Sequence, residues 1–178
     1  MRKFMMAAVS LSALAAAPAV AQTVTGTVFV NGSVAPKCQF TTPSQTIPLG
    51  EMAGTDGRLS AAVVNGQTRT LVGWCNATAS TMSVEAQPLV NTSFAPAAPT
   101  GFDKVVNYTG TAVANAVPGT DTSTTAGAGS PVTVGLFTGN IPVTLSAAST
   151  PTGGLLVAGN YSGQVLVTLT PAAALPPA

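Results

Sequence analysis

Residues 159–170 read GNYSGQVLVTLT, a segment in which apolar and small polar side chains largely alternate. Alternation with a period of two is the pattern of a strand that buries one of its faces. On a strand, Tyr161, Val165, Val167 and Leu169 share one face. The segment is therefore predicted to be a strand that turns this face toward a core or a groove.

Segments of the same kind recur along the chain. They are rich in Val and Thr and are bounded by Gly, Pro and Asn, as strands are. After the first 21 residues the sequence has no sustained helical stripe of apolar residues. Short strands at this spacing predict an all-β antiparallel sandwich. The predicted strands are residues 23–30, 70–75, 79–84, 132–136, 141–145 and 164–169.

The regions between and beyond these strands are predicted from composition. Residues 95–99 are rich in Ala and Pro, and residues 120–130 are rich in Thr, Ala, Gly and Ser, so both are predicted to be surface loops. The tail 171–178 contains prolines that cannot donate to a sheet ladder, and it is predicted to be disordered. The sandwich domain is predicted to span residues 33–170.

The N-terminal segment, residues 1–21, has the pattern of a secretory signal peptide. Arg2 and Lys3 precede an apolar run over residues 4–17, and Ala19-Val20-Ala21 provides a small-x-small cleavage site. The mature chain is then predicted to begin at Gln22. A short membrane anchor is the alternative interpretation. No later stretch approaches the roughly 20 apolar residues of a membrane span, so none is predicted.

Charged residues make up only 6% of the chain, against about a quarter in an average domain. Without residues 1–21, four cationic and five acidic side chains remain. This near balance gives no electrostatic field that would attract nucleic acid or an anionic membrane. A surface so poor in charge is weakly protected against sticking to neighbours, which is tolerable in a subunit that lives inside a polymer.

The chain has two cysteines, Cys38 and Cys75. An exported chain with a single pair of cysteines usually forms a disulfide, and this pair is predicted to be bonded. The two residues are too far apart in sequence for a C-x-x-C redox motif or a zinc knuckle.

The sequence shows no catalytic, cofactor-binding or metal-binding pattern. It has no histidine, so a Ser-His-Asp triad is excluded, and it has no phosphate-binding or dinucleotide fingerprint. Glu51 and Asp56 flank a Gly-rich turn and are interpreted as solvated turn residues, and Asp103-Lys104 is predicted to lie on a loop. No enzyme and no cofactor are predicted, although an enzyme of unrecognised type stays open.

The segment before the first cysteine has an apolar face of its own. Val24, Gly26, Val28 and Val30 share that face, and Asn31-Gly32 follows as a turn or hinge signal. In one interpretation this is an ordinary strand of a closed sandwich. In the other, residues 22–32 are an extension that leaves its own domain and completes the sheet of a neighbour.

Four segments of the chain together resemble the spore coat protein U domain, a family of bacterial chaperone–usher-type pilin subunits. The resemblance covers most of the mature chain, from about residue 23 to residue 170. It is carried by TVTGTVFVNGSVAPKCQF (23–40), LGEMAGTDGRL (49–59), TLVGWCNATASTMSVE (70–85) and LVAGNYSGQVLVTLT (156–170).

This resemblance implies an incomplete immunoglobulin-like sandwich that lacks its last strand and is completed by a donor strand. A periplasmic chaperone fills the gap first, and the N-terminal extension of the next subunit then replaces it at an outer-membrane usher. The matching residues are Val24, Gly26, Val28 and Val30 for the donor strand, Cys38 and Cys75 for the structural disulfide, and Tyr161, Val165, Val167 and Leu169 for the last strand beside the acceptor groove.

The implied function is that of a structural subunit of a surface fibre, which contributes to adhesion or biofilm formation. Its partners would be copies of itself or related pilins, and it would pass through the periplasm to the cell surface. The chain departs from the family pattern in its tail beyond residue 170 and in its long 120–130 segment. The alternative function is a secreted, self-complemented sandwich that binds a target and does not polymerise.

Overall fold

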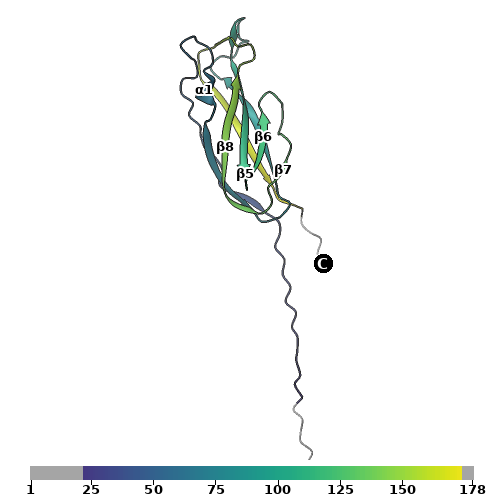
Figure 1. The fold of residues 1–178 in the computed structure, drawn as a ribbon. Coiled ribbons are helices and arrows are strands. Elements are labelled where there is room, and N and C mark those ends of the chain that lie inside the picture. The colour runs from purple at the N-terminus through teal and green to yellow at the C-terminus, as the bar shows by residue number, and fades with distance from the viewer. Residues whose placement is uncertain (1–21, 174–178) are drawn as a thin grey trace, which may run out of the picture. The chain divides into compact units, whose positions relative to one another are not determined.

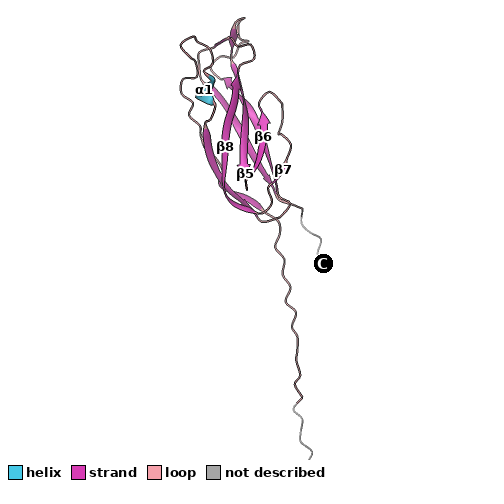
Figure 2. Cartoon of the chain, in the orientation of Figure 1, coloured by secondary structure: helices cyan, strands magenta, loops and turns pink. Residues whose placement is uncertain are grey.

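The computed structural model describes residues 22–173, which form an N-terminal extension (22–33) and a body (34–173). The regular secondary structure of the body is almost wholly β-strand (Figure 1, Figure 2). The predicted signal peptide, residues 1–21, and the last part of the predicted tail, residues 174–178, lie outside the described residues.

Ten strands and one helical turn make up the regular structure of residues 22–173. In chain order they are β1 (Cys38–Thr42), α1 (Ala61–Val64), β2 (Thr68–Cys75), β3 (Thr81–Asn91), β4 (Phe102–Asp103), β5 (Val105–Ala114), β6 (Val117–Thr122), β7 (Val132–Thr133), β8 (Phe137–Ser149), β9 (Leu155–Leu156) and β10 (Tyr161–Thr170).

The strands form two antiparallel layers that share β5. In one layer the order is β1-β2-β8-β5, with β6 paired to β5, so that β8, β5 and β6 lie side by side (Figure 1). In the other layer β3 lies between β10 and the first residues of β5, and β7 also pairs with β3. The short strands β4 and β9 form a separate parallel pair.

The core lies between the two layers and consists of two hydrophobic clusters. Met82 and Ile141, which come from β3 and β8, are completely buried in one of them. The other contains Val64 of α1 together with Val106 and Tyr108 of β5. Burial of these side chains is the main favourable term for the fold, because each contributes roughly 1.5–3 kcal/mol when fully removed from water.

The two layers are joined along one side of the sandwich and remain unjoined along the other. On the joined side β5 bonds to both β8 and β3. On the other side lie β1 and β10, which are the two ends of the strand order. Within the described residues β10 pairs only with β3, and β1 only with β2.

The prediction of an all-β antiparallel sandwich is confirmed. The segments 70–75, 141–145 and 164–169 lie within β2, β8 and β10. The segment 79–84 begins too early, because β3 starts at Thr81, and only the first two residues of 132–136 form a strand.

Strand β5 was not predicted, although its residues alternate between buried and partly buried along its whole length. Its inward face includes Gly110, Ala112 and Ala114, and such small side chains give a weak hydrophobic alternation. The small residues are required by packing. A Cβ atom on Gly110 would lie 3.1 Å from both Cγ atoms of Val165.

The prediction of a surface loop over residues 120–130 is wrong in its first part, because β6 continues to Thr122. Two buried polar side chains explain the order. The Asp121 carboxylate accepts a hydrogen bond from the Ala86 amide at 2.8 Å, and the Ser123 hydroxyl accepts one from the Tyr108 amide at 2.9 Å. These contacts satisfy buried amides, which composition alone does not reveal.

Candidate functional site

A groove runs along the unjoined side of the sandwich, between β10 and the segment 43–57 that follows β1. The groove has two parts. The first, beside the middle of β10, has a volume of about 420 Å³ and is lined by residues 43–49 on one wall and 163–167 on the other. A second part of about 910 Å³ follows, lined by residues 46–57 and 156–163. The groove therefore extends beside most of β10.

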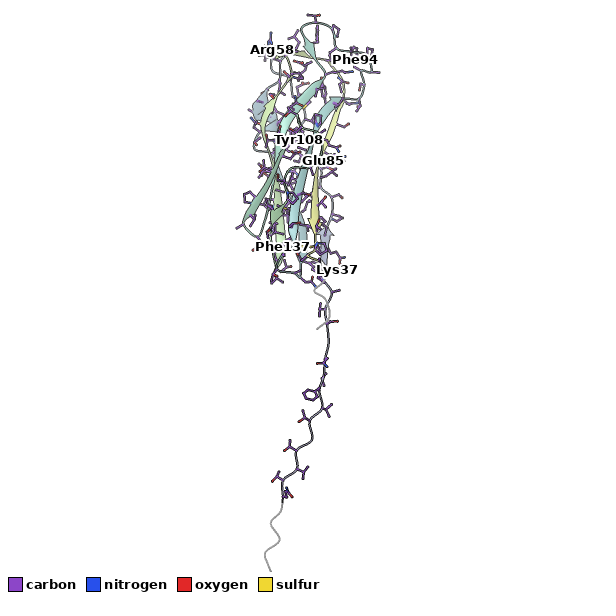
Figure 3. All side chains as sticks on the ribbon, turned by 90° about the vertical axis from the view of Figure 1, so that its right-hand side faces the viewer. Lys37, Arg58, Glu85, Phe94, Tyr108 and Phe137 are labelled. Carbon is purple, nitrogen blue, oxygen red and sulfur yellow. A yellow bond between two sulfur atoms is a disulfide. The ribbon has the colours of Figure 1, made fainter. Side chains whose placement is uncertain are left out.

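The two ends of the body serve as reference points for this groove. Figure 3 shows Arg58 and Phe94 at one end, here called the loop end, and Lys37 and Phe137 at the opposite end, here called the disulfide end. Tyr108 lies between them. Strand β10 starts at Tyr161, near the loop end, and its last residues approach β1 at the disulfide end.

The four residues predicted for the last strand lie on the inward face of β10. Tyr161 and Val165 pack on the cluster that contains Tyr108, and Val165, Val167 and Leu169 pack on the cluster that contains Met82. All four side chains are partly buried. The structure thus brings the four together on one face, on which Tyr161, Val165 and Val167 line the groove.

The groove is closed off near Leu169. The Leu169 Cδ1 atom lies 3.4 Å from where a Cβ atom of Gly73 would stand, and the same position is 3.3 Å from the ring of Phe40. Leu169 is not among the residues that line either part of the groove. There is therefore little room for a further side chain at the disulfide end.

The opposite wall, residues 43–57, was not assigned to the site from the sequence. Ile47 and Leu49 pack against the core, and the Arg69 guanidinium donates to the Thr46 carbonyl at 2.9 Å. The only local signal is the pair Ile47 and Leu49 at alternate positions, and two residues are too few to stand out.

Glu51 and Asp56 occupy the turn at the loop end of this wall, where the turn prediction placed them. The Glu51 carboxylate accepts a hydrogen bond from the Ala53 amide at 2.9 Å, and the Asp56 carboxylate accepts one from the Arg58 amide at 3.1 Å. The Arg58 guanidinium donates to the Gly153 carbonyl and so ties this turn to a second loop.

Tyr108 of β5 contacts both β3 and β10 from the core side of the sheet. Its hydroxyl lies 2.6 Å from the Gln87 carbonyl oxygen of β3 and 2.9 Å from the Gln164 carbonyl oxygen of β10, and it donates its proton to one of them at a time. Burial raises the pKa of Tyr108 to about 12. The hydroxyl therefore stays protonated, as a hydrogen-bond donor, across the whole physiological range.

Glycines allow the start of β10 to approach β3 closely. A Cβ atom on Gly163 would lie 2.6 Å from the Pro88 carbonyl oxygen, at a bulge in the β3–β10 register. Gly159 has φ +145°, and a Cβ atom there would meet the Asn91 side chain at 2.7 Å. Asn91 in turn donates to the Val157 carbonyl at 2.9 Å. The glycines before and within β10 are thus explained by packing.

The prediction that Asp103 lies on a loop is wrong, because it belongs to β4 and is buried. Its carboxylate accepts hydrogen bonds from the Gly154 amide at 2.7 Å and the Thr152 hydroxyl at 2.9 Å. Burial by itself raises the pKa of Asp103, but the hydrogen bonds from Thr152, Gly154 and Thr150 outweigh it and hold the pKa below 3.8. This carboxylate fixes the loop between β8 and β9.

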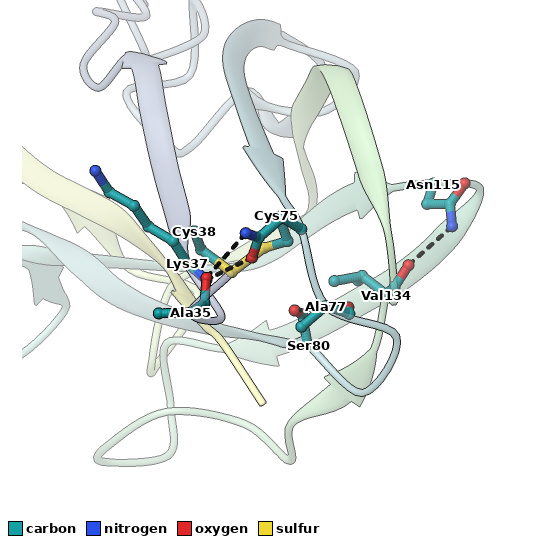
Figure 4. The surroundings of a disulfide bond; sticks show 9 residues. Ala35, Lys37, Cys38, Cys75, Ala77, Ser80, Asn115 and Val134 are labelled. Atoms are coloured by element: carbon teal, nitrogen blue, oxygen red, sulfur yellow. Dashed lines mark hydrogen bonds between the residues drawn. A yellow bond between two sulfur atoms is a disulfide. The ribbon is translucent and has the colours of Figure 1, made fainter. Parts of the chain in front are cut away.

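Cys38 and Cys75 form the predicted disulfide. They stand directly opposite each other on β1 and β2, with Cα atoms 4.1 Å apart. Figure 4 shows the bond and its surroundings, where the Asn76 side chain accepts from the Lys37 amide and donates to the Ala35 carbonyl. Closing a loop of this length stabilises the fold by roughly 3–4 kcal/mol in the chain-entropy model.

The extension has no regular secondary structure over residues 22–33, so the strand predicted for residues 23–30 is absent from this chain. Val24, Val28 and Val30 are 86%, 87% and 91% exposed. A Cβ atom on Gly26 would meet nothing within 4 Å. Phe29 is also 85% exposed.

Comparison with models of known protein families finds no match for this chain. A search of curated proteins finds no similar one either. Within residues 22–173, no helix is long and apolar enough to cross a membrane. In the same residues, no three His, Cys, Asp or Glu side chains are grouped so that they could hold a metal ion.

Proposed function

We propose that this chain is a structural subunit of a surface fibre, in which the extension of one subunit fills the groove of the next. The observation that carries the proposal is a complementary pair of features within one chain. The body has an apolar groove beside the unpaired edge of β10, and the extension alternates apolar and polar residues without belonging to any strand.

A strand added at this edge would pair with the free backbone groups of β10 and would also bury the apolar face of the extension. Unpaired amides and carbonyls at a sheet edge are a template for another strand. A strand added beside β10 supplies main-chain hydrogen bonds, and its alternate side chains fill the groove. Burial of Val28 and Val30 would contribute roughly 3–6 kcal/mol, at 1.5–3 kcal/mol per side chain. The contact is head-to-tail, so it propagates as an open filament.

The resemblance to the spore coat protein U domain supplies the rest of the proposal. The chain would be exported by a signal peptide, held by a periplasmic chaperone, and assembled by an outer-membrane usher into a fibre at the cell surface. Adhesion or biofilm formation would be the role of that fibre. The intramolecular disulfide and the low charge agree with life outside the cytoplasm in a polymer.

Deletion of residues 22–30 tests the proposal. The truncated body, produced with its chaperone and then given a synthetic peptide of residues 23–30, should become a stable monomer that cannot elongate. The full-length mature chain should form polymers under the same conditions. A matched peptide with Val28→Asp should fail to stabilise the body, because it brings a charge into an apolar groove.

A self-complemented binding module gives the opposite result. The full-length chain would then be a heat-stable monomer without any chaperone, added peptide would change nothing, and deletion of residues 22–30 would unfold it. Size-exclusion chromatography and thermal melting distinguish the two outcomes.

A further inference from the structure

We propose that Phe29 of one copy packs on Leu166 of the next copy, and that this outward-facing pair sets the register of the donor strand. The inference rests on the proposed function and specifies the occupant of the groove as the segment 24–31 of a second copy of this chain. It concerns the face of the donor strand that points away from the groove.

The outward faces of the two strands each carry one large apolar side chain. If the valines of the extension face the groove, Phe29 faces outward, and it is 85% exposed in the single chain. Leu166 is the large apolar residue on the outward face of β10, and it is 41% exposed. The other residues on that face are polar: Ser162, Gln164, Thr168 and Thr170.

Placing Phe29 opposite Leu166 in an antiparallel pair makes every other outward pair polar. Directly opposite side chains on one face of a sheet interact, and apolar or hydroxyl pairs are favourable there. A slip by two residues would set Phe29 against Gln164 or Thr168, and a slip by one would turn the valines out of the groove. The polar pairs in the proposed register are Thr25–Thr170, Thr27–Thr168 and Asn31–Gln164.

The inward face independently favours the same register. Val28 then lies opposite Val167 and Val30 opposite Val165, and both of these β10 residues line the 420 Å³ part of the groove. Gly26 lies opposite Leu169, at the closed end of the groove, where the side chains of Leu169 and Phe40 both lie beside Gly73. A donor residue without a side chain is what that end can accept.

The length of the chain between extension and body shows that a donor antiparallel to β10 must come from a second copy. Phe40 is level with Leu169, so Cys38 lies two residues further toward the disulfide end. At about 3.3 Å per residue, Val165 is about 20 Å from the level of Cys38.

Ala35 is bonded to the Asn76 side chain at the disulfide end. The five residues from Val30 to Ala35 span at most about 18 Å. They would also have to reverse direction, so Val30 cannot reach Val165 of its own chain in antiparallel register. A chain that filled its own groove would fold back along β1 and run parallel to β10.

Engineered cysteine pairs test the register and the orientation. The native Cys38–Cys75 bond shows that directly opposite residues of two antiparallel strands can be linked in this protein. Full-length chains carrying Phe29→Cys are mixed with chains carrying Leu166→Cys, Gln164→Cys or Thr168→Cys, assembled and oxidised. Chains with Thr27→Cys are mixed with the Thr168→Cys and Gln164→Cys chains to report the orientation.

The proposal predicts disulfide-linked dimers for the 29–166 and 27–168 pairs on non-reducing gels, with the linked peptides identified by mass spectrometry. Strong linkage of 29–164 or 29–168 would overturn the register while leaving strand exchange in place. Linkage of 27–164 would indicate a parallel donor and would overturn the orientation. If no pair is linked between chains, both this inference and the proposed function fail.

A double-mutant cycle on the wild-type cysteine background gives a second measurement. Phe29→Ala and Leu166→Ala should each speed the release of subunits from fibres in denaturant by about two- to five-fold, as expected for a cross-strand pair. The double variant should be no faster than either single variant, and Ser146→Ala, at an exposed position of β8 outside the proposed interface, should have little effect. Multiplicative effects of Phe29→Ala and Leu166→Ala would contradict a direct contact.

Discussion

The extension and strand β10 have similar sequences but different structures. Both alternate Val and Thr, and both contain a glycine near the middle or start of the pattern. Strand β10 is bonded to β3 along its length and turns four side chains onto the core. Residues 22–33 form no strand, and their valines are almost fully exposed.

The difference shows that alternating apolar and polar residues define an apolar face on a strand. They do not determine which surface that face packs against. A strand is stable only when its backbone groups and its apolar face both find partners. For β10 those partners are β3 and the core of the same body. For the extension they are proposed to lie on another copy, so substitutions in the two segments should have different consequences.

The largest contrast is expected when a charge is introduced into each segment. Val165→Asp places a carboxylate against Gly110 and both core clusters, and it should lower the free energy of unfolding by about 3 kcal/mol or more. Val28→Asp should leave the stability of the body unchanged and abolish fibre formation. Urea unfolding and electron microscopy measure the two effects, with Thr25→Asp as an outward-facing control that still assembles.

The glycines give the next contrast. Gly163→Ala forces a Cβ atom toward the Pro88 carbonyl oxygen and should destabilise the body by about 1–3 kcal/mol. Gly26→Ala meets nothing within the single chain, so the melting temperature should not change. It should slow assembly, because the new methyl group meets the closed end of the groove. Normal assembly of the Gly26→Ala chain would contradict the proposed position of Gly26.

The loop between β8 and β9 is held by the Asp103 carboxylate, whereas the extension contains no carboxylate. Asp103→Asn should cost about 1–3 kcal/mol, because the Gly154 amide and the Thr152 hydroxyl lose a charged acceptor. Since folding lowers the pKa of Asp103, its stabilising effect is present above about pH 4 and is lost as the pH falls through the lowered value. Acid unfolding of the wild type and the variant should therefore converge at low pH.

The smallest effect is expected at Tyr108, which ties β10 to β3. Tyr108→Phe should cost about 1 kcal/mol by removing the hydroxyl from two carbonyl oxygens. Because folding raises the pKa of Tyr108 to about 12, its contribution is complete below pH 10 and is lost between about pH 10 and 12. Ultraviolet titration of the native protein should show one tyrosine that ionises late, and its absence in the variant identifies Tyr108.

The sequence predicts the strands whose inward faces carry large apolar residues and fails where packing requires small ones. Strands β8 and β10 have Val, Leu or Ile at alternate positions, whereas the second half of β5 turns Gly110, Ala112 and Ala114 inward. Buried carboxylates were misassigned for another reason. Asp103 and Asp121 accept hydrogen bonds from residues far away in the sequence, and no local pattern signals this.

The candidate site was predicted only on one side. The alternating face of β10 and the cysteine pair were found because each has a recognisable local signal. The other wall, residues 43–57, has no strand pattern, since it is held by the core and by contacts such as Arg69 with Thr46. The groove is formed by two segments that are distant in sequence. Patterns within single segments therefore predicted the β10 wall and missed the wall formed by residues 43–57.

The cross-strand disulfide has a mechanical consequence in a fibre assembled as proposed. Tension along such a fibre would enter each body through the extension and reach Cys38, the first residue of β1. Without the bond to Cys75, that pull would reach β2 only through the hydrogen bonds between β1 and β2. With it, the load passes directly into β2, while the donor strand beside β10 is loaded in shear, with all its hydrogen bonds sharing the force. Pulling single fibres with and without reductant should show a lower rupture force once the disulfide is reduced.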